Sequence, residues 1–503
     1  MNKKNRNNAG ESEGLIGLTI ERLLSENAKE GLFSIGYLLF ISFLFTFNFR
    51  MNEPFFTFLS WKEALAGALV IAISALTVAS YISIRKKKLP DDRRKVFFLL
   101  GITLFLLLTI KGSALVSLYL VPVAFATSMI ALFIDFETGL SINLFLAVAI
   151  GVQLGFNGVI GPTMVAFVGG LVGILETKDI GRISDLTNIG ISVGLVNMVL
   201  VFAFRFPELS TPFITNLDWT NYTWAGLNGL TSALFIAAAV PLAERITQIT
   251  SPIGLMELLN PSHPLMEKLR TETPGTYHHS QNIASLGENA ARAIGADPLI
   301  TKVGGYYHDI GKMVRPDFFI ENQSEDSNPH DDLTPSMSKI VLTSHINQGI
   351  QLGKNYGLRD DVLEFIPTHH GTSLIRYFYL KALREHRDDV EFPEGDFRYE
   401  GRLPRTKETA IIALADPVEA ASHTLEDSGQ RLKEMVEEQI DNKIEDGQLD
   451  YSPLTLEDIA RIKEAFTETL RAMDQRRVQN YPKRGADTLE AEELEEGGID
   501  SEQ

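Results

Sequence analysis

The first half of the chain alternates long apolar runs with short polar stretches. After the polar and charged residues 1–30, the first apolar run extends from Gly31 to Phe49. Further runs lie at 64–84, 96–110, 113–134, 141–157, 159–176, 185–206 and 223–243. Most of them approach the ~20 residues that an α-helix needs to cross the hydrocarbon core of a bilayer. The pattern therefore predicts a polytopic transmembrane helical bundle.

Two features decide how these runs are counted. The stretch 141–176 is too long for one span, and Gly155, Gly158 and Gly161 interrupt it near its middle, so we divide it in two. Residues 1–30 are too long and too acidic for the basic region of a secretory signal, and no small-residue cleavage site follows the first run. We therefore expect about eight spans, of which the first is a retained signal anchor.

Positive charge in the loops sets the expected orientation. The 85–95 loop carries seven Lys and Arg residues, and the 177–184 loop is basic too. Such loops stay on the cytoplasmic side. Eight spans with the N-terminus inside place both loops, and everything after residue 245, in the cytoplasm. The alternative of seven spans, with 96–110 re-entrant, breaks this agreement. We expect a multi-pass protein of the cell (plasma or inner) membrane.

Few ionisable side chains fall within the expected spans. Asp135, Glu137 and Asp185 lie at their edges. Because charges inside the membrane usually mark ion or proton paths, this argues against a pump or a channel. Four amide side chains also lie in the spans: Asn143, Gln153, Asn188 and Asn197. They could line a ligand pocket, although hydrogen bonding between helices is the simpler explanation.

After residue 245 the pattern becomes that of a helical soluble domain. Asp297 and Thr334 each precede a proline, as N-cap residues do, and Gly295 and Gly357 are typical of helix ends. The whole chain is therefore expected to be all-α. We divide it into a cytoplasmic tail at 1–30, a transmembrane region at 31–245, a linker at 246–264, a helical domain at 265–480 and an acidic tail, expected to be disordered, at 481–503.

The two halves also differ in charge. The formal net charge is −18, but residues 1–245 carry +2 and residues 246–503 carry −20. An acidic domain does not attract nucleic-acid polymers, which favours a small ligand as the partner. The chain contains no cysteine, so disulfides, thiolate metal sites and a cysteine nucleophile are excluded.

Histidine is concentrated in the second half. Eight of the ten histidines fall between residues 278 and 386. Their segments include YHHS (277–280), HDIGK (308–312), SH (344–345) and THHGT (368–372), and ADP (415–417) adds an aspartate. Imidazole and carboxylate suit iron, manganese or zinc when thiolate is unavailable. If His308 and Asp309 share one helix, their side chains point about 100° apart, so both can face one cavity.

The order H…HD…H…HH…D resembles that of the HD-domain metal-dependent phosphohydrolases in their two-metal form. The resemblance implies two divalent metal ions, manganese or iron, as cofactors. One ion would be held by His279, His308 and Asp416. The other would be held by His345, His369 and His370, with Asp309 bridging the two.

Paired cations suit the hydrolysis of a phosphate ester, because they lower the pKa of a bound water and offset charge on the leaving oxygen. Asp309 and Lys312 are the expected catalytic residues, and Lys312 would bind a phosphate oxygen or the developing charge. An ordinary exposed lysine is the alternative for Lys312. We prefer His279 to its neighbour His278 as a ligand because its spacing to the HD pair matches the family better. The histidines left without a role are His263, His330, His386 and His423.

Longer segments narrow the resemblance to the seven-transmembrane HD (7TM-HD) family, whose members hydrolyse cyclic di-AMP to linear pApA. These segments are TPGTYHHS (273–280), YYHDIGK (306–312), RPDFFIENQ (315–323), NPHDDL (328–333), HHGTSLIRYFY (369–379) and FRYEGRLPRTKETAIIALADPVEAA (397–421). The related HD-GYP enzymes, which cut cyclic di-GMP, carry Gly-Tyr-Pro after the HH pair. This chain has GTSL (371–374) instead, which argues against that substrate.

Three features depart from the family pattern. Only residues 50–63 separate the first two expected spans, where many members carry a large extracellular domain. Pro367 precedes the HH pair and is expected to kink or open its helix, which leaves the direction of His369 and His370 open. Pro417 stands where the family usually has serine, and it is expected to bend the helix beside Asp416. None of these changes removes a proposed ligand.

The sequence thus predicts a membrane-anchored phosphodiesterase that hydrolyses cyclic di-AMP and lowers the level of this second messenger. The expected substrate contacts are Arg315, Thr372, Arg376 and Tyr377, although packing in the core is the alternative for the aromatic residues 377–379. The expected partners are the cyclic dinucleotide and the lipid bilayer, and a homodimer is compatible with this organisation. Two alternatives stay open: a membrane receptor whose HD domain binds nucleotide without turnover, and a nucleotidase or dNTP hydrolase on the same fold.

Overall fold

The computed structural model describes residues 61–85, 89, 92–154, 160–206, 219–323, 328–385, 393–423 and 429–480. The chain divides into two compact units, the first ending at Ile253 and the second beginning at Gly254. The described residues form α-helices and short 3-10 helices, and among them only one isolated β-bridge occurs, between Leu374 and Arg398. The all-α prediction is therefore confirmed for this part of the chain.

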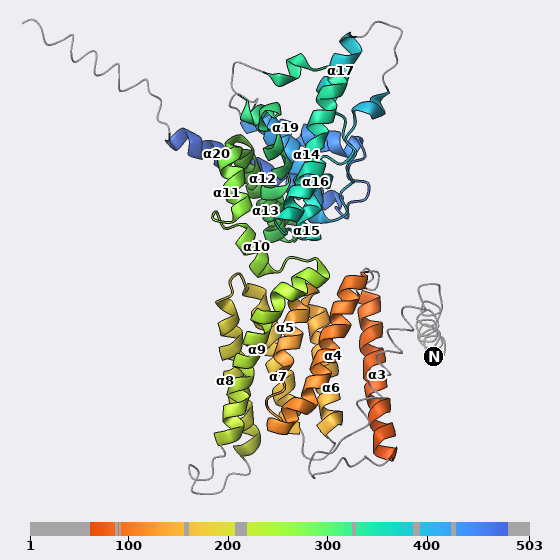
Figure 1. Cartoon of the computed structure of the whole chain (residues 1–503), viewed down its shortest axis with the longest axis vertical. Coiled ribbons are helices and arrows are strands. Elements are labelled where there is room, and N and C mark those ends of the chain that lie inside the picture. Colours follow the sequence, from red (N-terminus) through yellow and green to blue (C-terminus); the bar gives the residue numbers. More distant parts are fainter. Residues whose placement is uncertain are drawn as a thin grey trace, which may run out of the picture. The chain divides into compact units, whose positions relative to one another are not determined.

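The first unit is a bundle of helices that lie side by side (Figure 1). These are α3 (Trp61–Arg85), α4 (Arg93–Val116), α5 (Val123–Phe133), α6 (Phe136–Leu154), α7 (Ile160–Glu176), α8 (Asp185–Arg205) and α9 (Trp219–Thr247), with the 3-10 turn η1 (Thr177–Asp179) between α7 and α8. The predicted division of 141–176 is confirmed, because α6 ends at Leu154 and α7 begins at Ile160.

Three described helices are long and apolar enough to cross a membrane: α3, through residues 65–82, and the full lengths of α8 and α9. α5, α6 and α7 are apolar but provide shorter apolar segments. The described residues therefore support a membrane bundle without confirming eight spans. The expected signal anchor at 31–49 lies outside the described residues.

The predicted runs 96–110 and 113–134 are divided differently in the structure. α4 continues to Val116 and α5 starts only at Val123, directly after Pro122. The side chain of Asn228 in α9 donates from Nδ2 to the carbonyls of Tyr119 (2.7 Å) and Val121 (2.8 Å). These bonds add a donor for the backbone carbonyls of a non-helical segment in an apolar bundle, which helps the chain to leave helical geometry there.

The amides predicted in the spans have different environments. Asn143 is buried in α6 and donates from Nδ2 to the carbonyl of Phe167 in α7 (2.9 Å). This is the hydrogen bonding between helices that the sequence favoured over a ligand pocket. Asn197 in α8 is buried as well, whereas Asn188 is exposed. The side chain of Gln153 lies outside the described residues.

The second unit is a cluster of shorter helices. They are α10 (Pro252–Leu258), in which the boundary between the units falls, α11 (Pro264–Glu272), α12 (Pro274–Ile294), α13 (Pro298–Tyr307), α14 (Pro335–Asn355), α15 (Asp360–Leu363), α16 (Phe365–Thr368), α17 (Arg376–Glu385), α18 (Lys407–Ser422), α19 (Gly429–Glu445) and α20 (Leu456–Asn480). The 3-10 turns are η4 (Ile310–Val314), η5 (Pro316–Phe318), η6 (Ile320–Asn322), η7 (Pro329–Asp332) and η8 (Glu394–Phe397).

The predicted helix ends of this unit are confirmed. The side chain of Asp297 accepts from the backbone N–H groups of Leu299 and Ile300 at the start of α13. Thr334 caps α14 in the same way. Gly295 ends α12 with a φ of 67°, and Gly357 follows α14 with a φ of 80°. An L-residue with a side chain rarely adopts this left-handed conformation, so glycine is favoured at both positions.

Two hydrophobic cores hold the second unit together. One packs α12 against α18, α19 and α20 through residues such as Ile283, Ile412 and Phe466. The other joins α11, α13, α14 and α15 through residues such as Leu269 and Tyr307. Burying each large apolar side chain contributes about 1.5–3 kcal/mol. α12 and α13 pack on one another, which joins the two cores.

In the first unit, α8 and α9 touch at glycine backbone. A methyl group built at Gly229 in α9 would collide with the carbonyl oxygen of Gly190 and the amide nitrogen of Gly194 in α8. Backbone atoms cannot rotate away as side chains can, so the helices would have to separate. In lipid, close backbone packing of this kind replaces the hydrophobic effect as the source of helix association.

We expect Gly229→Ala to lower the free energy of unfolding by about 1–3 kcal/mol, because it overpacks this contact. Gly101→Ala in α4 is the matched control: nothing lies within 4 Å of its added methyl group. That substitution should leave stability unchanged or raise it by up to ~1 kcal/mol through helix propensity. Thermal unfolding of the detergent-solubilised chain, followed by circular dichroism, measures both. Equal stability of the two variants would contradict the close α8–α9 contact.

Candidate metal centre

Five segments of the second unit converge on Asp309. His279 lies in α12, His308 and Asp309 follow α13, His345 lies in α14, His369 and His370 follow α16, and Asp416 lies in α18. Asp309, His308 and His369 have no exposed surface, and His345 is almost completely buried. The seven ligands that the sequence predicted are thus gathered in one buried place.

The HD pair lies at a helix end and not within a helix, which corrects the geometry assumed from the sequence. α13 ends at Tyr307, and Asp309 has left helical geometry with a φ of −112° and a ψ of 15°. The chain then enters η4, where Gly311 lies directly on the α14 backbone. A side chain at Gly311 would collide with the carbonyl oxygen of His345. This contact brings α14 close enough for His345 to reach Asp309.

The two carboxylate oxygens of Asp309 face two different pairs of histidines. Oδ1 lies 3.4 Å from Nε2 of His345 and 3.4 Å from Nε2 of His369. Oδ2 lies 3.2 Å from Nε2 of His308 and 3.6 Å from Nε2 of His279. The predicted bridging role requires such an arrangement, with one oxygen of Asp309 toward each pair of histidines.

Asp416 also faces two histidines. Its Oδ1 lies 3.3 Å from Nε2 of His279, and its Oδ2 lies 3.2 Å from Nδ1 of His370. The sequence grouped Asp416 with His279 and His308 alone, and the structure adds the contact with His370. α18 continues past Pro417 to Ser422, so this proline does not end the helix beside Asp416.

Backbone carbonyls fix the tautomers of three histidines. The Nδ1–H of His308 donates to the carbonyl of Gly305 (2.8 Å). In the same way, His345 donates to Leu342 (2.6 Å) and His369 donates to Ile366 (2.7 Å). A carbonyl can only accept, so the proton sits on Nδ1 and the lone pair of Nε2 points toward Asp309. Metal-bound histidines are commonly oriented in this way.

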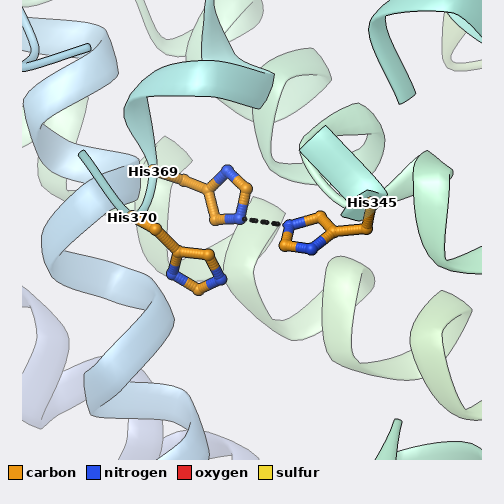
Figure 2. A group of neighbouring side chains, drawn as sticks. All are labelled: His345, His369 and His370. Atoms are coloured by element: carbon orange, nitrogen blue, oxygen red, sulfur yellow. Dashed lines mark hydrogen bonds between the residues drawn. The ribbon is translucent and has the colours of Figure 1, made fainter. Parts of the chain in front are cut away.

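The histidines after α16 lie against His345, as Figure 2 shows. Nε2 of His369 is 3.3 Å from Nε2 of His345. With both Nδ1 atoms protonated, two lone pairs face each other at this distance, and a cation between them removes the repulsion. The ring of His370 stacks on Tyr399, with 4.2 Å between centroids. Pro367 lies within α16, where the N–H of His369 still donates to the carbonyl of Phe365 (3.2 Å).

The donor set fits divalent cations. Nε2 of His279, Nε2 of His308 and Oδ1 of Asp309 are buried and lack a hydrogen-bond partner among the described residues. Buried polar atoms without partners are rare in folded proteins, and cations would satisfy them. Three groups have ligand atoms close enough to share an ion: His345, His369 and His370; His279, His308 and Asp416; and His308, Asp309 and His369.

The charge states of two proposed histidine ligands suit metal binding. A third, His279, differs: burial alone would lower its pKa, but the carboxylates around it raise the pKa well above its ordinary value. Burial lowers the pKa of His345 to about 4. Burial, with His369 nearby, holds the pKa of His370 well below its usual range. Both rings are therefore neutral at pH 7 and can offer lone pairs. Burial alone would raise the pKa of Asp309, but the Lys312 ammonium and the surrounding imidazoles outweigh it and keep this carboxylate ionised.

Lys312 is buried, so its interpretation as an exposed lysine is wrong. Its Nζ lies 2.7 Å from Oδ2 of Asp309 and 2.8 Å from Oε1 of Glu321. Burial by itself would lower the pKa of Lys312, but these two carboxylates raise it above the ordinary value. The ammonium is thus charged and paired with two anions.

Two carboxylates of the centre were not predicted from the sequence. Glu419 accepts from Nδ1–H of His279 (2.7 Å) and from Nδ2 of Asn282 (2.8 Å). It lies three residues after Asp416, one helical turn along α18, and that spacing could have indicated it. Glu321 comes from η6 and pairs with Lys312. Nothing in the local pattern of residues 315–323 marks it.

The predicted substrate contacts are less buried than the ligands. Arg315, Arg376 and Tyr377 are exposed, and Tyr377 retains 66% of its surface, whereas Phe378 is part of the core. Thr372 is half-buried, and its N–H donates to Oε1 of Gln448 (2.9 Å). Of the unassigned histidines, His330 is buried and hydrogen-bonded to the carbonyl of Phe318 (2.9 Å).

These features define a membrane protein with an HD-type metal centre, and comparison with known proteins agrees. The family described as "7TM receptor with intracellular HD hydrolase" matches residues 61–251, and the HD domain family matches residues 276–421. The first unit of the chain is thus similar to the membrane region of this family, and the second unit to the HD domain.

Curated relatives include two proteins named cyclic-di-AMP phosphodiesterase PgpH. That of Bacillus subtilis is 33% identical over 436 residues, which is 84% of this chain and 60% of the relative. That of Listeria monocytogenes is 32% identical over 423 residues, 82% of this chain and 58% of the relative. The chain thus spans about 60% of the length of these relatives.

A solved structure is also similar to this chain. The crystal structure of the HD domain of Listeria monocytogenes PgpH in complex with cyclic-di-AMP is 41% identical. The match covers 42% of this chain and 99% of that one, with a TM-score of 0.41.

We expect His279→Ala to remove bound metal, because Nε2 of His279 faces both Asp309 and Asp416. His278→Ala is the matched control, since the neighbouring His278 is exposed. Elemental analysis of the purified chain after dialysis against manganese compares the two variants with the original. Metal loss from the His278 variant, with none from the His279 variant, would reverse our assignment of this pair.

Glu419→Gln should weaken metal binding by about 10–100-fold, as is usual when the partner of a metal-bound histidine is changed. The amide of glutamine has the size of the Glu419 carboxylate, but it can turn its NH₂ group toward His279. The variant side chain therefore no longer fixes the proton on Nδ1 of His279. Titration of the chelator-stripped chain with manganese measures the dissociation constant. An unchanged constant would show that Glu419 does not orient His279.

Proposed function

We propose that this chain is a membrane-anchored phosphodiesterase that hydrolyses cyclic di-AMP to pApA with a two-metal HD centre. The observation that carries the proposal is that the two carboxylate oxygens of Asp309 face two separate pairs of imidazoles. A single carboxylate shared in this way suits two cations that act on one phosphoryl group.

The proposed ligands divide into two sets around Asp309. His279, His308 and Asp416 would hold one ion, and His345, His369 and His370 the other. The bound cations, expected to be manganese or iron, would activate a water molecule and offset charge on the phosphoryl oxygens. The choice between these metals rests on the resemblance to the family, because the donor set suits both.

The remaining residues of the centre hold the ligands in place. Lys312 fixes Oδ2 of Asp309 from one side and is itself held by Glu321. Its catalytic contribution in our proposal is to keep Asp309 ionised and oriented and to add positive charge near the phosphate. Glu419 orients His279 through Nδ1. A centre whose ligands are already fixed loses less free energy in reorganisation when it binds substrate.

The choice of substrate is supported by the relatives and by the loop after the HH pair. Both curated relatives above are named for cyclic-di-AMP. The loop GTSL (371–374) lacks the Gly-Tyr-Pro element of the enzymes that cut cyclic di-GMP. We propose Thr372 as a contact beside the HH pair, Arg315 and Arg376 as phosphate contacts, and Tyr377 as a stacking surface for adenine. The exposure of Tyr377 leaves its ring accessible for stacking.

We also propose that the catalytic unit lies in the cytoplasm and that the chain crosses the cell membrane several times. The apolar helices α3, α8 and α9 support membrane insertion. The basic loops at 85–95 and 177–184 support the orientation. Hydrolysis at this location would lower the cytoplasmic level of the second messenger.

The direct test uses the full chain, purified in detergent and supplied with manganese. We expect cyclic di-AMP to be converted to pApA, identified by its mass, and cyclic di-GMP to be cleaved more slowly. Binding of cyclic di-AMP without turnover across several metals would support the receptor alternative. Release of phosphate or triphosphate from mononucleotides, with the cyclic dinucleotide intact, would support a nucleotidase.

Asp309→Ala should abolish this turnover, because it removes the only carboxylate that faces both histidine pairs among the described residues. Residual activity should fall by at least ~10³-fold, the order expected when a central electrostatic group is lost. Asp317→Ala, at an exposed aspartate of η5, is the control and should retain activity. Full activity of the Asp309 variant with metal still bound would contradict the bridging role.

A further inference from the structure

Two lysines of the second unit, Lys312 and Lys443, lie close to the residues of the candidate metal centre, and their partners differ. Lys312 is paired with the carboxylates of Asp309 and Glu321. Lys443, in α19, donates from Nζ to the hydroxyl of Ser373 (2.8 Å). Among the described residues, no carboxylate lies within ion-pair distance of Lys443. Lys443 is therefore a cation whose charge is not neutralised by direct contact.

Lys443 is placed next to the metal centre by its partner. Ser373 lies three residues after His370, and its N–H donates to the His370 carbonyl (3.0 Å) in a tight turn. α19 packs on α18, the helix that carries Asp416. Burial lowers the pKa of Lys443, and the charges of Asp416 and Asp446 oppose this effect. The ammonium thus lies within the electrostatic range of a proposed metal ligand.

The turn that bears Ser373 is held rigidly by residues after the HH pair. Arg398 donates from Nη1 to the carbonyl of Thr372 (2.9 Å) and pairs with Asp446 (2.7 Å). Gln448 accepts from the N–H of Thr372 (2.9 Å) and donates to its hydroxyl (3.1 Å). With Lys443, three side chains fix residues 371–373. A turn so constrained can present a hydroxyl and an ammonium in a fixed geometry.

A cyclic dinucleotide carries two phosphate groups, and the metal centre acts on one of them. The second phosphate must bind to a unit that is itself strongly negative: residues 246–503 carry a net charge of −20. Without a local cation this phosphate would be repelled. Lys312 is already paired with two carboxylates, and Arg315 and Arg376 are the exposed phosphate contacts of the proposed function. Lys443 is a further cation, and its partner Ser373 lies three residues after His370.

We propose that Lys443 and Ser373 form a phosphate-binding subsite for the substrate phosphate that does not react. This inference rests on the proposed function and deepens it. The subsite draws Lys443 from α19, outside residues 276–421 that match the HD domain family. The ammonium donates to a non-bridging oxygen, and the Ser373 hydroxyl holds the ammonium in position and can donate to the same group. Substrate binding thereby depends on helices that follow the domain defined by the metal ligands.

Lys443→Met in the full manganese-loaded chain tests the subsite. A charge-assisted hydrogen bond to phosphate contributes about 1.5–3 kcal/mol, so KM for cyclic di-AMP should rise by roughly 10–100-fold. Bound manganese should stay unchanged, because Lys443 is not a ligand. Lys443→Arg, which keeps the charge, should restore part of the affinity. Lys433→Met is the control: Lys433 lies on α19 too and is 63% exposed, so its variant should behave as the original chain.

A second measurement separates failure of the subsite from failure of the proposed function. Pyrophosphate is the probe, because it carries two phosphoryl groups and no nucleoside. If the original chain does not cleave cyclic di-AMP, the proposed function fails. The subsite is still supported if the Lys443→Met variant binds pyrophosphate more weakly than the Lys433→Met variant does. Equal KM and equal pyrophosphate affinity in these two variants would overturn it. Loss of manganese from the Lys443→Met variant would also overturn it, by showing a structural role.

Discussion

The buried carboxylate of Asp309 is the group on which the arrangement of the second unit depends. An ionised carboxylate without exposed surface is stable only when positive or polar groups surround it. Lys312 supplies the charge at 2.7 Å, and four imidazole Nε2 atoms lie around the carboxylate, where cations would join their lone pairs to its oxygens. To place them there, the chain leaves α13 at Asp309, Gly311 lies on the α14 backbone, and α16 ends at the HH pair. The local backbone geometry follows from the need to enclose one anion.

The same requirement explains why the centre is incomplete as protein alone. Four carboxylates come together here, those of Asp309, Glu321, Asp416 and Glu419. Among the described residues, Lys312 is the only lysine that pairs directly with any of them. His345 and His370 are neutral at pH 7, so they add lone pairs and no charge. Divalent cations would balance these anions and satisfy the buried atoms that lack partners. Metal binding should therefore stabilise the fold as well as enable the chemistry, since ligand binding to the folded state adds to its stability.

The sequence predicts those features that short spacings encode. The order of the histidines and aspartates indicated seven side chains that the fold brings together, and Asp297, Thr334, Gly295 and Gly357 indicated helix ends. Features that depend on distant segments could not be predicted in this way. The break at Pro122 needs Asn228 from α9, the burial of Lys312 needs Glu321, and the contact between Lys443 and Ser373 joins residues 70 positions apart. Hydropathy likewise indicated a membrane bundle, but it placed the limits of α4 and α5 incorrectly, because tertiary hydrogen bonds decide where a buried helix can stop.

The most direct test of the account is anomalous X-ray diffraction from the manganese-loaded chain, which locates the ions themselves. We expect two peaks, one beside His279 and His308 and the other beside His345 and His369, with one oxygen of Asp309 contacting each. A single peak, or two ions of which neither contacts Asp309, would contradict the claim that this carboxylate joins two metal sites.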